Sequence, residues 1–120
     1  MNDKKYNLEE RLIDFAVAII NFAETLPNTK SANHLGGQLL RSGTSPSLNY
    51  GEARSAESQN DFIHKMKVCL KELRESYNCL CILHRAKIYD SEEQVQSHIA
   101  ECNELIAIFV KSISTASTKK

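Results

Sequence analysis

The residues best suited to hydrolytic chemistry in this sequence are two serines beside a proline, two histidines and an aspartate. They are Ser45, Ser47, His34, His64 and Asp61. A serine hydrolase of the α/β type carries its nucleophile in a Gly-x-Ser-x-Gly turn that follows a strand. The 120-residue sequence has neither that motif nor a strand pattern, and serines next to a helical proline commonly bond to nearby backbone carbonyls. We therefore expect no serine catalysis.

Metal and phosphate sites have equally little support. The four cysteines include no Cys-x2-Cys pair, and a helix would turn the thiols of Cys79 and Cys81 about 160° apart, too far for one zinc ion. Di-iron bundles need Glu-x-x-His pairs, which the sequence lacks. Gly36 and Gly37 have no Gly-Lys-Ser/Thr context for a phosphate loop. We expect no enzyme activity, no metal, no cofactor and no small-molecule substrate.

Charge placement is more informative. Segment 64–87 holds six lysines and arginines against two glutamates, whereas segment 88–110 holds five acidic residues and neither lysine nor arginine. On a helix, the cations from Lys67 to Arg74 share one face with His64, within about 80°. The cations of this segment that could contact nucleic acid are Lys67, Lys71, Arg74, Arg85 and Lys87.

Three interpretations of this charge pattern stay open. The charges can form solvated faces, stabilised by pairs four residues apart such as Lys71–Glu75 and Asp61–Lys65. The basic stripe can meet nucleic-acid phosphates, although 15 basic and 15 acidic residues leave no net charge to drive such binding. Alternatively, the basic and acidic faces can join subunits head to tail.

The composition predicts one globular domain, residues 1–120. The chain has a mass of 13.5 kDa, with 42% hydrophobic and 25% charged residues, as in ordinary globular domains. No apolar run approaches the roughly 18 residues that cross a bilayer, and the first residues lack the apolar core of a secretory signal. We expect a cytoplasmic protein without membrane contact, whose cysteines stay reduced.

Apolar residues recur at three- and four-residue steps throughout the chain, and this spacing predicts helices. We expect four of them, at roughly 8–26, 32–55, 60–87 and 92–113. The candidate N-caps are Asn7, Ser31, Ser58 or Asn60, and Ser91. Residues from about 114 to 120 carry no apolar anchor and should fray. Four amphipathic helices with short links predict an all-α, antiparallel up-down four-helix bundle.

Pro46 interrupts the pattern of the second helix. A proline inside a helix removes one hydrogen bond and clashes with the preceding turn. The helix either ends near Arg41 and restarts, or continues to about Ser55 with a kink at Pro46. A loop longer than about 12 residues would be unusual in a compact bundle. We prefer the kinked helix. In it, the hydroxyls of Thr44 and Ser45 would hydrogen-bond to the backbone groups that the proline disturbs.

The stretch from Leu39 to Glu75 carries a specific polar signature. It reads LLRSGTSPSLNYGEARSAESQNDFIHKMKVCLKELRE. This stretch resembles the central signature of a bacterial family of four-helix bundles. The first members of this family are encoded by intervening sequences within 23S ribosomal RNA genes. The matching elements are Arg41-Ser42-Gly43-Thr44-Ser45, Asn49, Glu52-Ala53, Ser58, Asp61 to Met66, and Lys71-Glu72 with Glu75.

The resemblance implies a left-handed four-helix bundle that assembles into a ring, usually a homopentamer, without known enzymatic activity. A related group serves as the accessory protein of diversity-generating retroelements and binds reverse transcriptase and RNA through a basic pentamer surface. We therefore expect a non-enzymatic oligomeric scaffold or binding module. The alternative is an RNA- or DNA-binding accessory protein that acts through a basic face of the ring.

The polar signature also needs a physical account. Its polar members are Arg41, Asn49, Glu52, Asp61, Lys65, Glu72 and Glu75. So many polar side chains do not fit the apolar contact between the helices of a bundle, and buried charges must be paired. We expect them at the contact between the second and third helices and at the subunit interface. There, Arg41 or Lys65 would meet Glu72 or Glu52.

Overall fold

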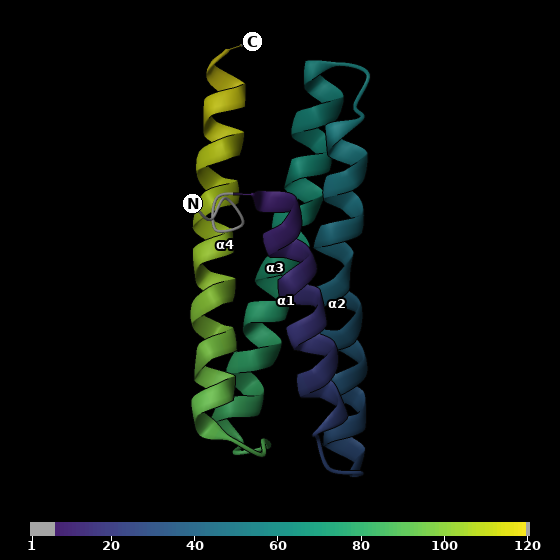
Figure 1. Ribbon diagram of the computed structural model, residues 1–120, viewed down its shortest axis with the longest axis vertical. Helices are drawn as coiled ribbons and strands as arrows, with labels where there is room; N and C mark the ends of the chain where they lie inside the picture. Colours follow the sequence, from purple (N-terminus) through teal and green to yellow (C-terminus); the bar gives the residue numbers. More distant parts are fainter. Residues whose placement is uncertain (1–6, 120) are drawn as a thin grey trace.

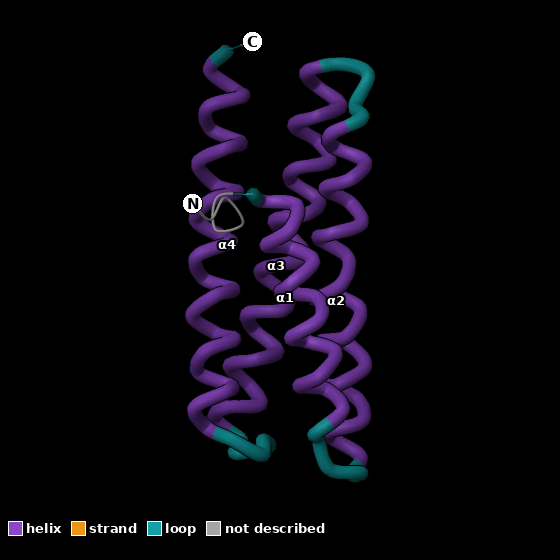
Figure 2. Tube along the Cα trace, in the orientation of Figure 1, coloured by secondary structure: helices purple, strands orange, loops and turns teal. Residues whose placement is uncertain are grey.

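The computed structural model describes residues 7–119, and this part of the chain contains four helices. They are α1 (Leu8–Glu24), α2 (Lys30–Arg54), α3 (Gln59–Arg85) and α4 (Glu92–Thr118). Short links make each helix antiparallel to the next (Figure 1). α1 and α3 each pack on both α2 and α4, and only turns and coil separate the described helices (Figure 2). The predicted all-α four-helix bundle is therefore confirmed.

Side-chain caps fix where the helices begin. Asn7, Ser58 and Ser91 each accept a hydrogen bond from the backbone N–H three residues further on, as good N-caps do. The second helix differs from the expectation, because its cap is Thr29 and not Ser31. Thr29 has the extended backbone of a capping residue, so α2 begins two residues earlier than its apolar pattern indicates.

The core forms where the apolar stripes of the four helices meet. Fully burying a large apolar side chain stabilises the fold by about 1.5–3 kcal/mol, so these residues drive assembly of the bundle. None of the described helices is long and apolar enough to cross a membrane. The largest fully buried side chains are Phe15, Phe109, Leu12, Ile19, Leu39, Met66, Leu73, Leu80, Leu83, Leu105, Val95 and Pro46.

α2 continues through Pro46 as one helix, so the expectation of a continuous helix is confirmed, whereas the bend at Pro46 stays a prediction. The hydroxyls of Thr44 and Ser45 donate to carbonyl oxygens four residues earlier, over 2.8 and 2.7 Å. The carbonyl that loses its usual helical donor to Pro46 is that of Ser42. The two hydroxyls therefore donate to the carbonyl oxygens of Leu40 and Arg41, which directly precede Ser42.

Gly43 allows α1 and α2 to approach closely. A Cβ at this position would lie 2.8 Å from Cγ2 of Ile19, nearer than packed carbon atoms come. The backbone of Gly43 is ordinary helix, so the glycine is needed for space and not for its conformational freedom. This contact fixes the position of α1 along α2.

One end of the bundle contains three helices. α1 has 17 residues, whereas α3 and α4 have 27 each, and α1 begins part of the way along α4 (Figure 1). The structure also differs from the frayed tail expected from about residue 114, because α4 continues to Thr118. Its last turns are held by the burial of Ala116, whose carbonyl accepts a hydrogen bond from Gln59 Nε2 over 2.9 Å.

Candidate functional site: the polar cluster between α2 and α3

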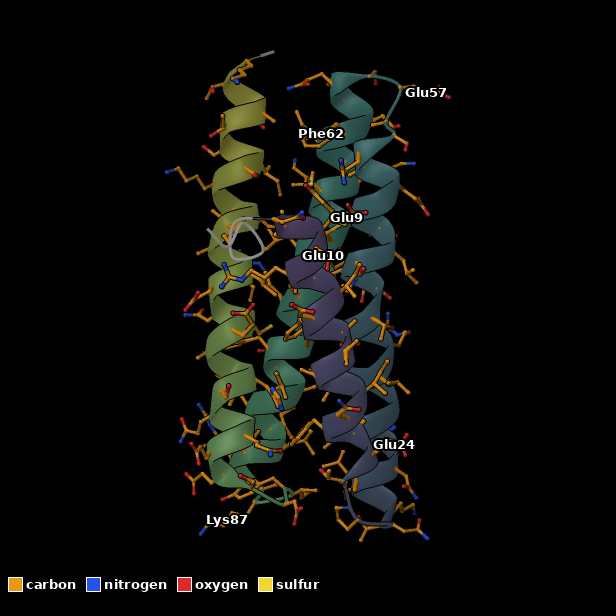
Figure 3. All side chains as sticks on the ribbon, in the orientation of Figure 1. Glu9, Glu10, Glu24, Glu57, Phe62 and Lys87 are labelled. Atoms are coloured by element: carbon orange, nitrogen blue, oxygen red, sulfur yellow. The ribbon has the colours of Figure 1, made fainter. Side chains whose placement is uncertain are left out.

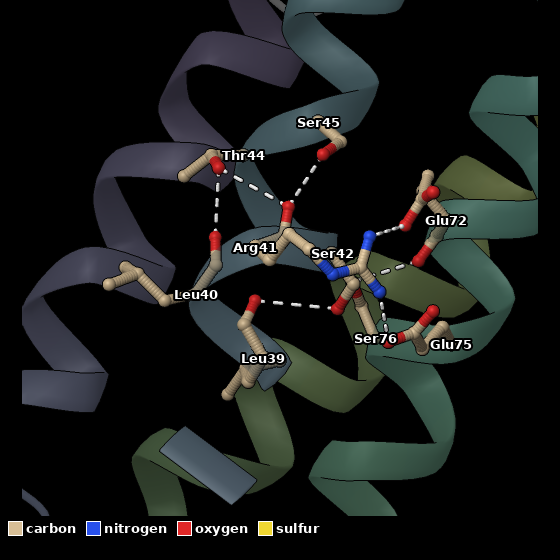
Figure 4. A network of polar contacts seen from close by, with 9 residues as sticks. All are labelled: Leu39, Leu40, Arg41, Ser42, Thr44, Ser45, Glu72, Glu75 and Ser76. Carbon is tan, nitrogen blue, oxygen red and sulfur yellow. Dashed lines mark hydrogen bonds and ion pairs between the residues drawn. The ribbon is translucent and has the colours of Figure 1, made fainter. Parts of the chain in front are cut away.

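Three of the polar signature residues, Arg41, Glu72 and Glu75, meet where α2 packs on α3 (Figure 4). Arg41 of α2 places Nη1 2.9 Å from Glu72 Oε1, and its Nη2 donates to Glu75 Oε2. The two glutamates lie three residues apart and therefore share one face of α3. Together they raise the pKa of Arg41, and Glu75 has the larger effect. We call Arg41, Ser42, Glu72, Glu75 and Ser76 the α2–α3 polar cluster.

Two fully buried serine hydroxyls lie beside this arginine. Ser76 Oγ is 2.8 Å from Ser42 Oγ, and Ser42 Oγ is 3.4 Å from the carbonyl oxygen of Leu39. Each hydroxyl has one proton, so Ser76 can donate to Ser42 while Ser42 donates to the Leu39 carbonyl. No buried side-chain nitrogen or oxygen of the described residues lacks a partner. The hydroxyls thus join the two helices without leaving a polar atom unsatisfied.

Sequence reasoning did not single out Ser76. The signal was present, since Ser76 lies three residues after Leu73 and four before Leu80, both fully buried. A serine on that stripe must be buried and must find a partner on the neighbouring helix. Ser42 on α2 is that partner, and small side chains on both helices bring the backbones close enough for the bond.

The ion pairs of the cluster lie at the edge of the bundle. The Arg41 side chain is 51% exposed and that of Glu72 is 13% exposed. The large penalty expected for breaking a fully buried pair therefore does not apply to Arg41. The guanidinium is already occupied by two carboxylates, and neither serine has a base beside it among its described hydrogen-bond partners. The geometry suits a structural contact between helices.

The remaining signature residues lie further along the same pair of helices. Lys65 Nζ is 3.6 Å from Glu52 Oε1 and 3.9 Å from Asp61 Oδ1. This second group joins the end of α2 to the start of α3. Asn49 is half-buried and makes no hydrogen bond to a described residue. The structure therefore brings six of the seven signature residues into two groups and leaves Asn49 outside both.

The candidate nucleic-acid contacts are all exposed, and Lys87 lies in the turn after α3 and not on the helix. Lys67, Lys71, Arg74, Arg85 and Lys87 make no ion pair with a described residue. The expected Lys71–Glu75 pair does not form, because Glu75 binds Arg41. The expected Asp61–Lys65 pair does form. The outer face of α3 is consequently positive and available.

Part of the acidic face predicted for α4 is paired within the chain. Arg11 of α1 makes two hydrogen bonds of 2.8 Å to Glu101, and its Nη2 lies 2.5 Å from Glu104 Oε1. Glu101 is the main cause of the raised pKa of Arg11. Sequence reasoning missed this contact, because its members lie about ninety positions apart and no local pattern connects them.

Another acid of α4 is held at the turn between α3 and α4. Glu92 Oε2 lies 3.2 Å from His84 Nε2 and 3.3 Å from Gln96 Nε2, and Glu92 Oε1 accepts from the hydroxyl of Tyr89 over 3.3 Å. These hydrogen bonds, that from His84 above all, lower the pKa of Glu92. His84 thus contributes to the link between α3 and α4.

The buried cysteines are not nucleophiles. Burial raises the pKa of Cys69 and of Cys102 to about 12, so both remain protonated thiols near neutral pH. Their Sγ atoms lie 3.6 Å and 3.2 Å from the carbonyl oxygens of Pro46 and Leu73. All four cysteines are free. They behave as small core residues with weak hydrogen bonds.

An open groove lies at the three-helix end. It has a volume of about 500 Å³ and is lined by α3 and α4 residues that include Phe62 and Ile108. Histidines, cysteines and carboxylates are absent from the described residues that line it. The groove therefore lacks the groups that acid–base or metal chemistry requires.

The fold and the polar cluster define a class of four-helix bundles whose signature residues hold α2 against α3. A family model described as 23S rRNA-intervening sequence protein matches residues 4–111, and the chain belongs to this family. A crystal structure of a protein of unknown function from the S23 ribosomal protein family of Bacteroides thetaiotaomicron VPI-5482 is 34% identical, with a TM-score of 0.80. The match covers 88% of this chain and 96% of that one. No curated protein matches the chain.

Proposed function

We propose that this protein is a non-enzymatic scaffold or binding module that assembles with copies of itself into a homopentamer. The observation that supports assembly is the apolar surface of α1 and α2. Of the seven large hydrophobic side chains that are exposed in the described residues, five belong to these two helices. Contiguous exposed apolar surface commonly marks an interaction site. The five residues are Ile13, Val17, Ile20, Leu40 and Leu48.

The α2–α3 polar cluster supports the non-enzymatic part of the proposal. Its arginine is bound to two glutamates, and its hydroxyls are buried and hydrogen-bonded to each other. These groups are engaged with one another across the two helices, which favours a structural role for them.

Sedimentation velocity at micromolar concentration tests the assembly. A homopentamer of 13.5 kDa chains should sediment as a species of about 67.5 kDa and should dissociate on dilution according to mass action. A single species of 13.5 kDa across this range would contradict self-assembly. An oligomer of another size would keep the scaffold and exclude the pentamer.

A second function, RNA or DNA binding, is favoured by the unpaired cations of α3. Five copies of Lys67, Lys71 and Arg74 around a ring would act together through their effective concentration. Binding to a structured RNA should weaken steeply between 50 and 200 mM salt, because phosphate contacts release counterions. The variant with these three residues changed to alanine should lose binding and most of the salt dependence. Changing Lys30, Lys111 and Lys119 to alanine removes the same charge elsewhere and should leave binding intact.

A cytoplasmic location belongs to the same proposal. Four free cysteines, of which Cys81 is partly exposed, suit a compartment in which thiols stay reduced. Fractionation of cells that express the chain should recover it with cytoplasmic markers. Recovery in an oxidising compartment would contradict this location.

A further inference from the structure

We propose that the apolar face of α1 and α2 packs against the basic face of α3 of a second copy of this chain. The inference rests on the proposed self-assembly and identifies its contact. It is an alternative to nucleic-acid binding by Lys67, Lys71 and Arg74 in the ring, because the contact would cover these three side chains. The basic face consists of Lys67, Lys71, Arg74 and Asn78. The apolar face consists of Ile13, Val17, Ile20, Gly37, Leu40, Thr44, Leu48 and Gly51.

The residues of the apolar face form two parallel lines on one side of the hairpin. On each helix they are spaced by three or four positions, so each set shares a helix face. Gly43 contacts Ile19 across the hairpin, and Thr44 and Ile20 each follow one position later, about 100° further round. Because α1 and α2 are antiparallel, this equal rotation turns both lines toward the same side.

Two glycines on this face are not explained by the fold of the single chain. A Cβ at Gly37 or at Gly51 would meet no atom within 4 Å, and neither glycine has a positive φ. Glycine inside a helix weakens it relative to alanine, so a chain with no use for the space would gain by filling it. The space they leave is a shallow strip beside Leu40 and Leu48, where long side chains of another helix can lie.

The charges of the two faces are complementary. Glu10 and Glu24 stand near the two ends of α1, exposed and without an ion pair to a described residue (Figure 3). On α3, Lys67, Lys71 and Arg74 are likewise exposed and unpaired. Lysine and arginine stems pack on apolar surface while their charged ends reach outward, so the basic face can cover the apolar line, and Lys67 can meet Glu10, which lies near its level. The acids of α4 are less suited, because Arg11 and His84 already hold most of them.

The two faces also lie at the same height in the bundle. Glu9 of α1 and Lys65 of α3 are level, because both make ion pairs with the last turns of α2. Ile19 and Ser76 are level, because both contact the middle of α2. A neighbouring copy can therefore dock by rotation about an axis parallel to the helices, without a shift along it. Head-to-tail contacts of this kind close into a ring and do not form a helical filament.

Variants of each face test the contact. The apolar-face variant carries Val17→Gln and Leu48→Gln, which remove apolar surface without adding partners for the cations, and the basic-face variant carries Lys67→Glu, Lys71→Glu and Arg74→Glu. All these positions are exposed, so helicity by circular dichroism should match the wild type. Each variant alone should sediment as a 13.5 kDa monomer. The control Val110→Glu, at an exposed apolar position on α4, should assemble like the wild type.

Mixing the two face variants gives the decisive readout. One intact apolar face and one intact basic face remain, so the mixture should form a single heterodimer of about 27 kDa and nothing larger, twice the 13.5 kDa chain mass. Wild-type assembly that persists in both variants overturns the proposal, as does dimerisation of either variant alone, which would indicate a self-complementary contact. A monomeric wild type would instead contradict the proposed function itself.

Discussion

The α2–α3 and α1–α4 contacts use the same ionic arrangement. In each, one arginine binds two glutamates that lie three residues apart on the neighbouring helix, a spacing that places both carboxylates on one face. The guanidinium can then satisfy both with a single fork of donors. The two sets are Arg41 with Glu72 and Glu75, and Arg11 with Glu101 and Glu104.

The surroundings of the two arginines differ. Arg11 is 20% exposed and Arg41 is 51% exposed. Beside Arg41, the buried Ser42–Ser76 pair joins the helices, whereas the other contact has an edge-to-face ring pair of Phe22 and His98, 5.2 Å apart. This difference shows that the same arrangement of one arginine and two glutamates can contribute differently to two helix contacts. Buried hydroxyls hold α2 to α3, and the arginine itself holds α1 to α4.

The largest expected effect comes from filling the hydroxyl site. Ser76→Leu places a large side chain where Ser76 is fully buried, so overpacking should lower the free energy of unfolding by about 3 kcal/mol. The control Ser76→Ala removes the contacts of Ser76 Oγ with Ser42 Oγ and with the Glu72 carbonyl oxygen, and it should cost about 1 kcal/mol. Urea unfolding measures both. Equal costs for the two variants would mean that the helices separate freely to admit leucine.

Exchanging each arginine for leucine compares the two contacts directly. Arg11→Leu should lower the free energy of unfolding by about 2 kcal/mol, because Arg11 is mostly buried and bonded to charged partners. Arg41→Leu should cost less, since its pairs are solvated. Urea unfolding at low and at high salt measures the difference, and salt should reduce the Arg41 effect more. A larger loss for Arg41→Leu would reverse the assignment of roles.

A double-mutant cycle isolates the hydroxyl pair. Ser42→Ala and Ser76→Ala should together cost less than the sum of their separate effects, with a coupling energy of about 1 kcal/mol, because each single change already removes the bond between the two hydroxyls. Chemical denaturation of the four proteins supplies the cycle. Strict additivity would show that the 2.8 Å contact between the hydroxyls contributes nothing.

The smallest expected effect is a pH dependence of the free energy of unfolding, which arises from His98 in the α1–α4 contact. Burial lowers the pKa of His98 below its ordinary value of 6.5. As pH falls through 6.5, the unfolded chain therefore binds a proton that the folded chain does not, and stability is lost. His98→Phe should keep the contact with Phe22 and reduce the loss of stability between pH 7 and pH 5. The exposed control His64→Gln should leave that loss unchanged, and identical curves for His98→Phe and wild type would contradict the prediction.

The local features of the fold were predictable from the sequence. Helix positions followed from apolar spacing, and the N-caps Asn7 and Ser91 followed from side chains that stand before the apolar stripes, whereas Ser58 was one of two candidates for α3. The start of α2 was not predictable from the sequence, because Thr29 and Ser31 are both good N-cap residues and their N-cap propensities do not separate them. The end of α4 depends on the distant hydrogen bond from Gln59, which has no signal in the last residues themselves.

The candidate site was predictable only in part. The signature indicated that Arg41 and Lys65 would lie beside glutamates of the second and third helices, and the structure places them there. It did not indicate Ser76, because a serine on an apolar stripe can satisfy its hydroxyl with several different hydrogen-bond partners. It also did not indicate Arg11, since pairing across the first and last helices depends on how far each helix extends along the bundle. Long-range contacts require the assembled packing, which local patterns do not encode.

The unequal burial of the thiols makes the molecule ready for spectroscopic labelling. Cys69, Cys79 and Cys102 are buried, whereas Cys81 is partly exposed, so a maleimide dye should react first at Cys81. No cysteine has to be introduced or removed to obtain one reporter per chain. In an assembled ring these reporters would form a regular polygon, and energy transfer between neighbouring dyes would then measure its side length in solution.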